Sequence, residues 1–354
     1  MAVADWFSGF DYITTGDGTL LVSGINPLVN FQSNVSVSTS AARTGTRSLL
    51  CGSGAFSYIC KTDLTSRTTY SLGFWLYSTS FATAANMCSM GEGNLATSSN
   101  AHISLRVTTG GNIQVVRGGG VGISQSAGTQ LGSNSSNTLS INTGYHIVLT
   151  VFISDTVGTV TVKVNGSSTG WHEQTGLDTR NGLTGVITSF GLGGFNNGSS
   201  VFYDDVWMAA SDLGDCRVTP INASTGDGSL ADFTPSSGTD NGAMVDEVAP
   251  DGDTTYNSST TAGNRDTYNF PASGILGATV HGVKVHNSCK KQDAGTVSMK
   301  PVIRISGVNY EGTEQFLPTT YGHVTQQYDV SPATASAWTV AEIDGAEFGI
   351  RHNA

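Results

Sequence analysis

Residues 145–166 read YHIVLTVFISDTVGTVTVKVNG, and this stretch decides the fold class. Apolar side chains recur at every second position of 145–153 and again of 160–164. A period of two is that of a β-strand with one buried face. Asp155-Thr156-Val157 separates the two runs, and Asn165-Gly166 closes the second in a turn that needs a positive φ. The stretch therefore predicts two consecutive antiparallel strands.

Similar runs surround this pair throughout the first half of the chain. They are YSLGFWLYS (70–78), HISLRV (102–107), NIQVVRG (112–118), GVITSFGLGG (185–194) and VFYDDVWMAA (201–210). The link TTGG between the second and third of these is a hairpin signal. Gly accounts for 45 of the 354 residues, and helix-forming residues are nowhere concentrated. Many short strands separated by turns predict an antiparallel sandwich or jelly roll.

The second half predicts a separate, smaller unit. Residues 211–270 are acidic and loop-rich, and strands resume at 278–288, 296–306 and 323–330. Thr339 and Glu342 have the spacing of a capping box before a helical turn that Gly345 ends. We expect an all-β protein of two antiparallel β-sandwich domains: a jelly roll over 1–214, and a smaller β-sandwich over 215–354.

Charge and cysteine content limit the partners and the compartment. The formal net charge is −11, and residues 215–354 carry 8 Lys and Arg against 16 Asp and Glu. Such a chain is poorly suited to binding nucleic-acid phosphates, so we expect no nucleic-acid partner. The first residues show no signal-peptide pattern, and no apolar run is long enough for membrane insertion. The five cysteines predict isolated thiols in a reducing cytoplasm, although Cys51 and Cys60 could meet across a hairpin.

A near repeat, TGDGTL at 15–20 and TGDGSL at 225–230, allows three interpretations. Nothing else aligns at that offset, which argues against domain duplication. A calcium loop needs oxygen ligands at several alternate positions, and Asp227 lacks them, while Asp251 and Asp253 supply only two. We therefore expect two separate turns in which Asp bonds back to its own backbone, with a calcium loop as the alternative.

No residue pattern predicts catalysis, a cofactor or a metal site. Sugar hydrolysis in a jelly roll commonly uses carboxylates on alternate residues of one strand, as Glu-x-Asp-x-Glu, and this triplet is absent. The seven histidines are scattered, and there is no G-x-S-x-G motif. From these absences the sequence predicts that the protein is not an enzyme.

Two pairs of residues are candidates for carbohydrate binding. Trp171 follows the NGSSTG turn, where an indole beside His172 could stack on a sugar ring or simply line the rim. Asp204 and Asp205 lie in VFYDDVWM, where strand alternation sends one carboxylate inward and the other outward. The inward carboxylate must be satisfied by loop amides or by a cation.

The first unit resembles the concanavalin A-like or laminin G-like jelly roll. SLGFWLYS (71–78), residues 145–168 and FYDDVWMAASDLG (202–214) carry this resemblance, in that order along the chain. It implies a largely structural role for Asp204 or Asp205 and sugar or calcium binding in the loops of one rim.

The second unit resembles C-terminal domains of tailed-bacteriophage virion proteins. Residues 245–270, 290–313 and 331–351 carry this second resemblance. It implies a structural virion protein, assembled in the host cytoplasm, in the tail or on the head surface, in which residues 215–354 serve particle docking or oligomerisation. Its partners would be other virion proteins, copies of itself and host surface glycan. The alternatives are a capsid decoration protein without a ligand and a polysaccharide-degrading enzyme on the tail.

Overall fold

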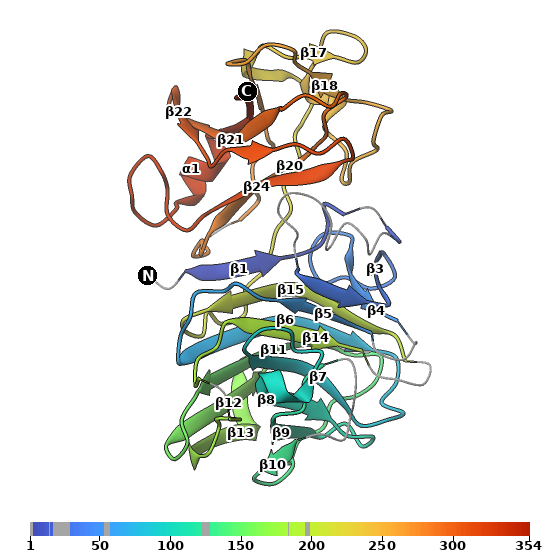
Figure 1. The fold of residues 1–354 in the computed structure, drawn as a ribbon, viewed down its shortest axis with the longest axis vertical. Coiled ribbons are helices and arrows are strands. Elements are labelled where there is room, and N and C mark those ends of the chain that lie inside the picture. Colours follow the sequence, from blue (N-terminus) through green and yellow to red (C-terminus); the bar gives the residue numbers. More distant parts are fainter. Residues whose placement is uncertain are drawn as a thin grey trace.

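The computed structural model describes residues 3–13, 15–16, 29–52, 57–121, 128–182, 184–194, 199–275 and 277–354. These residues form two β-sandwich units stacked along the long axis of the molecule (Figure 1). All strand pairs among the described residues are antiparallel, including those between strands far apart in the sequence. The predicted fold class, all-β with two antiparallel sandwiches of which the first is a jelly roll, is confirmed.

The first unit contains two packed sheets. The eight-stranded sheet runs in the order β13 (Ser167–Leu177), β12 (Gly158–Val164), β11 (Gly144–Phe152), β6 (Thr69–Ser78), β15 (Val201–Ala209), β4 (Ser48–Cys51) and β3 (Val35–Ser38), with β1 (Ala4–Ser8) also paired to β15. The seven-stranded sheet runs in the order β10 (Thr129–Leu131), β9 (Ile113–Arg117), β8 (Ala101–Val107), β7 (Ala85–Gly91), β14 (Ser189–Gly193), β5 (Tyr58–Lys61) and β2 (Phe31–Ser33). A short 3₁₀ turn, η2 (Ser98–Asn100), precedes β8.

The hairpin predicted from residues 145–166 is confirmed as β11 and β12, which pair from Ile147–Val164 to Phe152–Thr159. Asn165 and Gly166 have φ values of 50° and 84°, as the turn requires. The alternating apolar residues of both strands are buried in the core between the two sheets: Ile147, Leu149, Val151, Val160, Val162 and Val164. The alternation of the two strands and the residues of the turn between them were therefore sufficient to predict that the strands pair.

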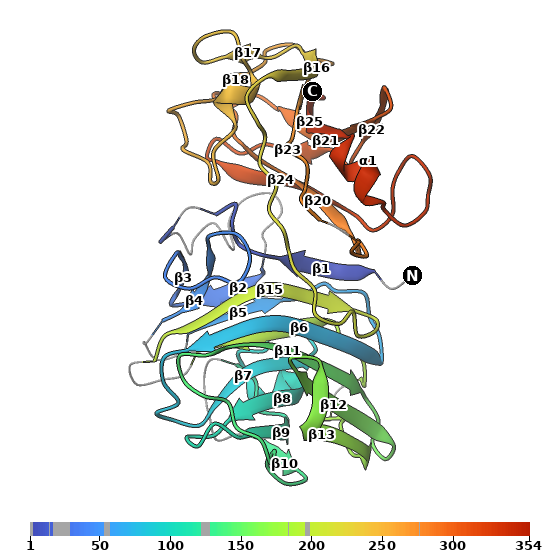
Figure 2. The same cartoon turned by 180° about the vertical axis from the view of Figure 1, so that it is seen from behind.

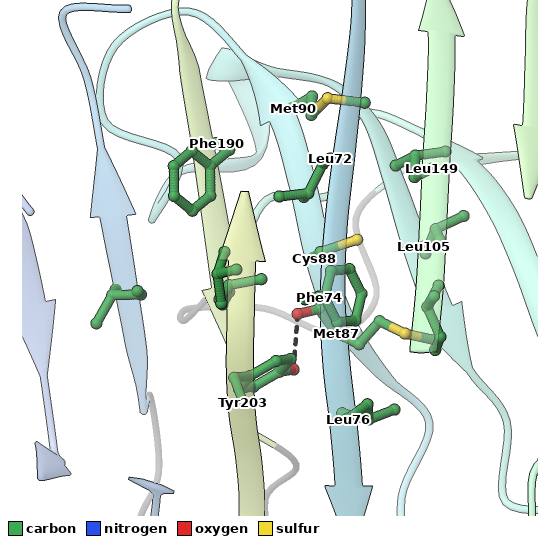
Figure 3. Packing of buried hydrophobic residues seen from close by; sticks show 14 of the residues in the cluster. Leu72, Phe74, Leu76, Met87, Cys88, Met90, Leu105, Leu149, Phe190 and Tyr203 are labelled. Atoms are coloured by element: carbon green, nitrogen blue, oxygen red, sulfur yellow. Dashed lines mark hydrogen bonds between the residues drawn. The ribbon is translucent and has the colours of Figure 1, made fainter. Parts of the chain in front are cut away.

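The core lies between the two sheets (Figure 3). Alternate residues of β6, Leu72, Phe74 and Leu76, point into it and are almost completely buried. Tyr203 is also fully buried, and its hydroxyl donates to the carbonyl oxygens of Met87 (2.8 Å) and Gly193 (2.6 Å). These bonds satisfy the polar end of a core aromatic and link β15 to the opposite sheet.

Cys51 and Cys60 are both buried but belong to different sheets, on β4 and β5. They therefore do not meet across a hairpin.

The second unit is smaller. Its main sheet contains β16 (Asp227–Ala231), β19 (Arg265–Tyr268), β25 (Glu347–His352), β21 (Ser298–Ile305), β22 (Val308–Glu311) and β23 (Gln315–Phe316), and it is accompanied by the pairs β17 (Thr234–Pro235) with β18 (Asn257–Ser258) and β20 (Val283–Cys289) with β24 (Gly322–Tyr328). A 3₁₀ turn, η3 (Gly242–Met244), and helix α1 (Val340–Asp344) complete it. The capping box is confirmed, since Thr339 accepts from the Glu342 N–H and the Glu342 side chain bonds back.

Of the repeated hexapeptide, residues 17–20 lie outside the described residues. In the second copy, Gly226 has a φ of 100° and Asp227 begins β16. Asp227 Oδ1 accepts from the N–H of Asn241 (2.6 Å) rather than from a neighbouring N–H, so its turn is closed by a distant segment.

The second unit covers one edge of the first. Strand β1 lies beside the β20–β24 strand pair in both views (Figures 1 and 2). The N–H of Ala4 donates to His281 O (3.3 Å), Gln327 Nε2 donates to Ala4 O, and Lys284 Nζ donates to Phe7 O. An exposed strand edge is prone to pairing with other chains, so these bonds protect β1. Across the described residues, no helix is long and apolar enough to span a bilayer.

Candidate functional site

Trp171 and His172 lie on the edge strand β13. His172 points inward, is 4% exposed, and its Nε2 donates to the carbonyl oxygen of Ile113 in the opposite sheet at 2.9 Å. Burial lowers the pKa of His172 below its usual value. Trp171 is partly buried against the edge of the core. His172 thus joins the two sheets where the sandwich closes.

Asp204 and Asp205 do not alternate as predicted. The pairing of β15 with β6 shifts between Asp204 and Trp207, and Asp205 has a φ of 49°. Such a bulge re-aims side chains, and here both carboxylates are fully buried and both reach Thr44. The expectation of one outward carboxylate is therefore wrong, because the bulge removes the period of two.

The two carboxylates fix a loop of the first unit. Asp204 Oδ2 accepts from the N–H groups of Arg43 (2.7 Å) and Thr44 (3.0 Å), and Asp205 accepts from Thr44 Oγ1 (2.8 Å) and the Val218 N–H (2.8 Å). Burial, followed by the charge of Asp205, raises the pKa of Asp204 to about 7. Hydrogen bonds from loop N–H groups, and from the Thr44 hydroxyl to Asp205, therefore satisfy both carboxylates. Of the two predicted alternatives, loop amides and a cation, the structure shows the loop amides.

The four predicted residues do not form one site. Strands β13 and β15 are separated by β12, β11 and β6. At the usual interstrand spacing, this places the two pairs about 19 Å apart. A sugar bound at Trp171 would therefore not reach Asp204.

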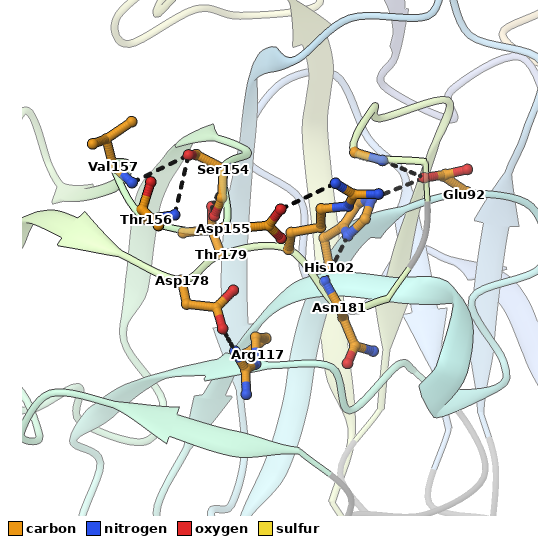
Figure 4. A network of polar contacts seen from close by, with 12 residues as sticks. Glu92, His102, Arg117, Ser154, Asp155, Thr156, Val157, Asp178, Thr179 and Asn181 are labelled. Atoms are coloured by element: carbon orange, nitrogen blue, oxygen red, sulfur yellow. Dashed lines mark hydrogen bonds and ion pairs between the residues drawn. The ribbon is translucent and has the colours of Figure 1, made fainter.

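A polar network lies at one end of the seven-stranded sheet (Figure 4). His102 is fully buried, and its Nε2 donates to Glu92 Oε1 (3.0 Å) and Val186 O (3.1 Å), while its Nδ1 accepts from the Asn181 N–H (3.1 Å). Burial lowers the pKa of His102, although Glu92 opposes this shift. With both nitrogens engaged, the ring holds the 178–186 segment in place and has no lone pair left for proton transfer.

The outer face of the same sheet carries a row of polar side chains that the sequence analysis missed. Asn86 of β7 pairs with Arg106 of β8, which pairs with Gln114 of β9. Their sequence neighbours Leu105, Val107, Ile113 and Val115 are in the core, so this row faces away from it. We call Asn86, Arg106 and Gln114 the polar row.

An exposed amide cluster extends the polar row toward the sheet edge. Gln114 Nε2 donates to Gln130 Oε1 (3.2 Å) and Asn134 Oδ1 (2.9 Å), and Gln130 Nε2 donates to the same Asn134 oxygen (3.0 Å). Side-chain amides both donate and accept hydrogen bonds without carrying charge. This surface is therefore suited to ligands rich in hydroxyl groups.

Arg106 is the charged member of the polar row. Its Nε donates to Asn86 Oδ1 at 3.1 Å, whereas its Nη2 is buried without a hydrogen-bond partner. No carboxylate of the described residues forms an ion pair with it. Burial lowers the pKa of Arg106 relative to an ordinary arginine, but an arginine remains charged at neutral pH. Nη2 is closed off from solvent, so an external anion would reach the guanidinium through Nη1.

The sequence contains a partial signal for this row. Arg106 and Gln114 occupy polar positions of the alternating runs at 102–107 and 112–118, on either side of the TTGG link. Alternation predicts that both face outward, but only the register shows that they are direct neighbours. Asn86 and Asn134 join them through strands and loops that alternation does not connect.

A metal site and a cavity are the other features that could bind a ligand. Within the described residues, no group of three or more His, Cys, Asp or Glu side chains could hold a metal ion. A cavity of about 1580 Å³ lies at the junction of the two units and is lined by Phe7, Tyr12, Lys284 and His286, among others. Lys284 and His286 bond within the protein, to Phe7 O and His323 Nδ1, so we assign them to the junction.

Comparison with known proteins gives a likeness in fold. The sequence matches no family model and no curated protein. Among solved structures, the chain is similar to an endo-β-1,4-glucuronan lyase from Trichoderma reesei (12% identity, TM-score 0.40, covering 53% of this chain and 93% of the lyase). It is also similar to an alginate lyase from Aplysia kurodai (14%, 0.36, 62% and 98%) and a Trypanosoma rangeli sialidase (16%, 0.33, 51% and 27%). At these values the likeness concerns the fold alone.

The prediction that the protein is not an enzyme is contradicted by this comparison. Lyases and sialidases are among the structures that resemble its fold. The missing Glu-x-Asp-x-Glu triplet excludes one arrangement of carboxylates, whereas other arrangements occur on many folds. The absence of that motif was therefore insufficient ground for the prediction.

Proposed function

We propose that the protein is an exposed component of a tailed-bacteriophage particle whose jelly-roll unit binds host surface glycan. The second unit docks to the particle or to sister copies. The resemblance of residues 245–270, 290–313 and 331–351 to virion proteins supports the particle assignment.

The observation that supports glycan binding is the polar row with its amide cluster. Strands β8, β9 and β10 lie toward the end of the first unit that is remote from the second (Figures 1 and 2). A ligand could therefore reach this face while the second unit is docked. Uncharged amides beside one guanidinium match the hydroxyl and acidic groups of surface polysaccharides.

The presence of several copies on one particle would raise its affinity for glycan. Particles are built from symmetric copies, and several weak sites on one particle raise the overall affinity without any new contact. A shallow face such as the polar row suits this mode better than a deep pocket. We therefore expect millimolar to micromolar binding by one copy and much tighter binding by particles.

Two experiments test this proposal. Immunogold labelling of intact particles with antibodies against residues 219–354 and 1–214 should place the protein on the particle with the first unit accessible. A glycan array probed with the full chain should then show binding. A protein absent from particles contradicts the particle assignment. Head labelling with a blank array favours a shell-stabilising role instead, and release of reducing or unsaturated ends would show that bound glycan is also cleaved.

A further inference from the structure

We propose that the polar row is a subsite for the carboxylate of an acidic sugar, with Arg106 as the anion-binding residue. This inference rests on the proposed glycan binding and adds the class of glycan, a polysaccharide containing uronic or similar carboxylated sugars. The structural basis is an arginine that is fixed in position, partly buried and without an acidic partner.

The charge environment of Arg106 differs from that of three other arginines of the first unit. Arg67 pairs with Asp5 (3.1 Å), Arg180 pairs with Asp155 (3.1 Å), and Arg117 pairs with Asp178. The chain carries 27 Asp and Glu against 16 Lys and Arg, so acidic partners are abundant. In the part of the chain that the structure describes, Arg106 has none, and its Nη2 is buried without a bond. Leaving a cation partly buried and unpaired costs free energy, which an incoming carboxylate would offset.

Asn86 holds the guanidinium in place. Its Nδ2 donates to Gly119 O and to Gly120 O (2.8 Å), so its Oδ1 is free to accept from Arg106 Nε. This fixes the plane of the guanidinium through Nε and leaves Nη1 as the group that a ligand can reach, because Nη2 is closed off from solvent. A guanidinium that is already oriented loses less entropy when it forms a charge-assisted hydrogen bond to a carboxylate.

The rest of the row supplies contacts to the sugar ring. Gln114 lies directly opposite Arg106 on the neighbouring strand, at the usual side-chain separation of about 5 Å. It leads to Gln130 and Asn134. A carboxylate at Arg106 therefore places the hydroxyls of the same or the next sugar beside uncharged donors and acceptors. The geometry favours carboxylated over neutral glycans.

Binding of the full chain to polygalacturonate tests this inference, with its fully methyl-esterified form as the neutral probe and dextran sulfate as the sulfated one. We expect polygalacturonate to bind at least about tenfold more tightly than the ester, which corresponds to one lost charge-assisted contact. Dextran sulfate should bind more weakly than polygalacturonate, because sulfate groups replace the hydroxyls that the uncharged amides beside Arg106 would contact.

Substitutions of Arg106 test whether this residue causes the preference for polygalacturonate over its ester. Arg106→Gln should weaken polygalacturonate binding about tenfold and leave binding to the ester unchanged. Arg106→Lys, which keeps a point charge without the planar fork, should give an intermediate loss and also serves if Arg106→Gln fails to fold. Arg180→Gln, which removes an arginine that already has a carboxylate partner, is the matched control and should bind as the wild type does.

The outcomes separate this inference from the proposed function. Equal binding of polygalacturonate and its ester, or undiminished binding by folded Arg106→Lys, overturns the carboxylate subsite while leaving glycan binding in place. Stronger binding of dextran sulfate than of polygalacturonate shows a non-selective anion site and also overturns it. Failure to bind any glycan, on the array and here, overturns both.

Discussion

His286 Nε2 lies 2.7 Å from His323 Nδ1 at the junction of the two units, and the ring of Tyr12 from the first unit lies over His286 with a centroid distance of 4.0 Å. One of these nitrogens must donate and the other must accept, so the contact exists only while at least one ring is neutral. The contact between the two units therefore depends on the protonation of this buried histidine pair, and so on pH.

The first prediction is that acid weakens the folded protein through this pair. Burial, then the charges of His323 and Lys284, holds the pKa of His286 well below its usual range. The unfolded chain takes up this proton near pH 6.5 while the folded chain does not, so stability falls as the pH drops below 6.5. Urea unfolding at pH 7.5 and 5.5 should show a larger loss for the wild type than for His286→Phe, which keeps a ring over Tyr12. Equal losses would remove the pair as the cause.

Lys284 provides the second prediction, in the alkaline range. It lies over the rings of Phe7 (4.7 Å) and Trp6 (5.4 Å), and burial lowers its pKa to about 7. Between pH 7 and about 10.4 the unfolded chain therefore binds the proton more strongly, and stability rises with pH. The difference in unfolding free energy between wild type and Lys284→Met should shift in favour of the wild type from pH 7 to pH 9. The buried thiols ionise in the same way in both proteins, so their contribution to the unfolding free energy cancels in the comparison. A difference in unfolding free energy that stays constant from pH 7 to pH 9 would contradict the lowered pKa of Lys284.

The third prediction concerns the loop held by Asp204. Asp204 accepts three backbone N–H bonds, from Arg43, Thr44 and Asp205. Asparagine replaces one accepting oxygen with a donor, so Asp204→Asn should lower the free energy of unfolding by about 1–3 kcal/mol. Asp212→Asn is the control, because Asp212 forms a partly exposed ion pair with Lys163 (2.8 Å) and should cost less than about 1 kcal/mol. Similar losses in both variants would show that the loop bonds add nothing.

The fourth prediction tests the packing of Trp207 on β6. A Cβ atom on Gly73 would lie 2.0 Å from Trp207 Cε2, and Trp207 is only 1% exposed. Gly73→Ala should therefore cost about 1–3 kcal/mol through overpacking. Gly52→Ala, where the nearest atom would be Asn34 O at 3.6 Å, should change thermal stability much less. A neutral Gly73→Ala variant would mean that Trp207 relocates without strain.

The sequence predicted those parts of the fold whose determinants are local. The β11–β12 hairpin and the Thr339–Glu342 capping box depend on residues a few positions apart, and both are confirmed. The bulge at Asp205 could not be read from alternation, because it depends on the loop at Arg43–Thr44, some 160 residues away. The hydrogen bond that the Asn241 N–H donates to Asp227 likewise joins segments that sequence alternation does not connect.

The candidate site was missed for the same reason. Arg106 looks like an ordinary outward residue of an alternating strand, and its lack of an acidic partner follows only from the arrangement of distant strands. Conversely, the sequence predicted that Trp171 and His172 could bind carbohydrate together, but His172 forms a hydrogen bond that joins the two sheets. The mistaken exclusion of enzymes came from treating one absent motif as the absence of all catalytic arrangements.

Hydrogen–deuterium exchange of the full chain with and without an acidic host polysaccharide tests the central claim most directly. Our account predicts slower exchange in peptides covering Ala85–Gly91, Ala101–Val107 and Ile113–Arg117, and no change in Val201–Ala209 or in the second unit. Protection confined to Val201–Ala209, to β13 or to residues 219–354 would contradict it.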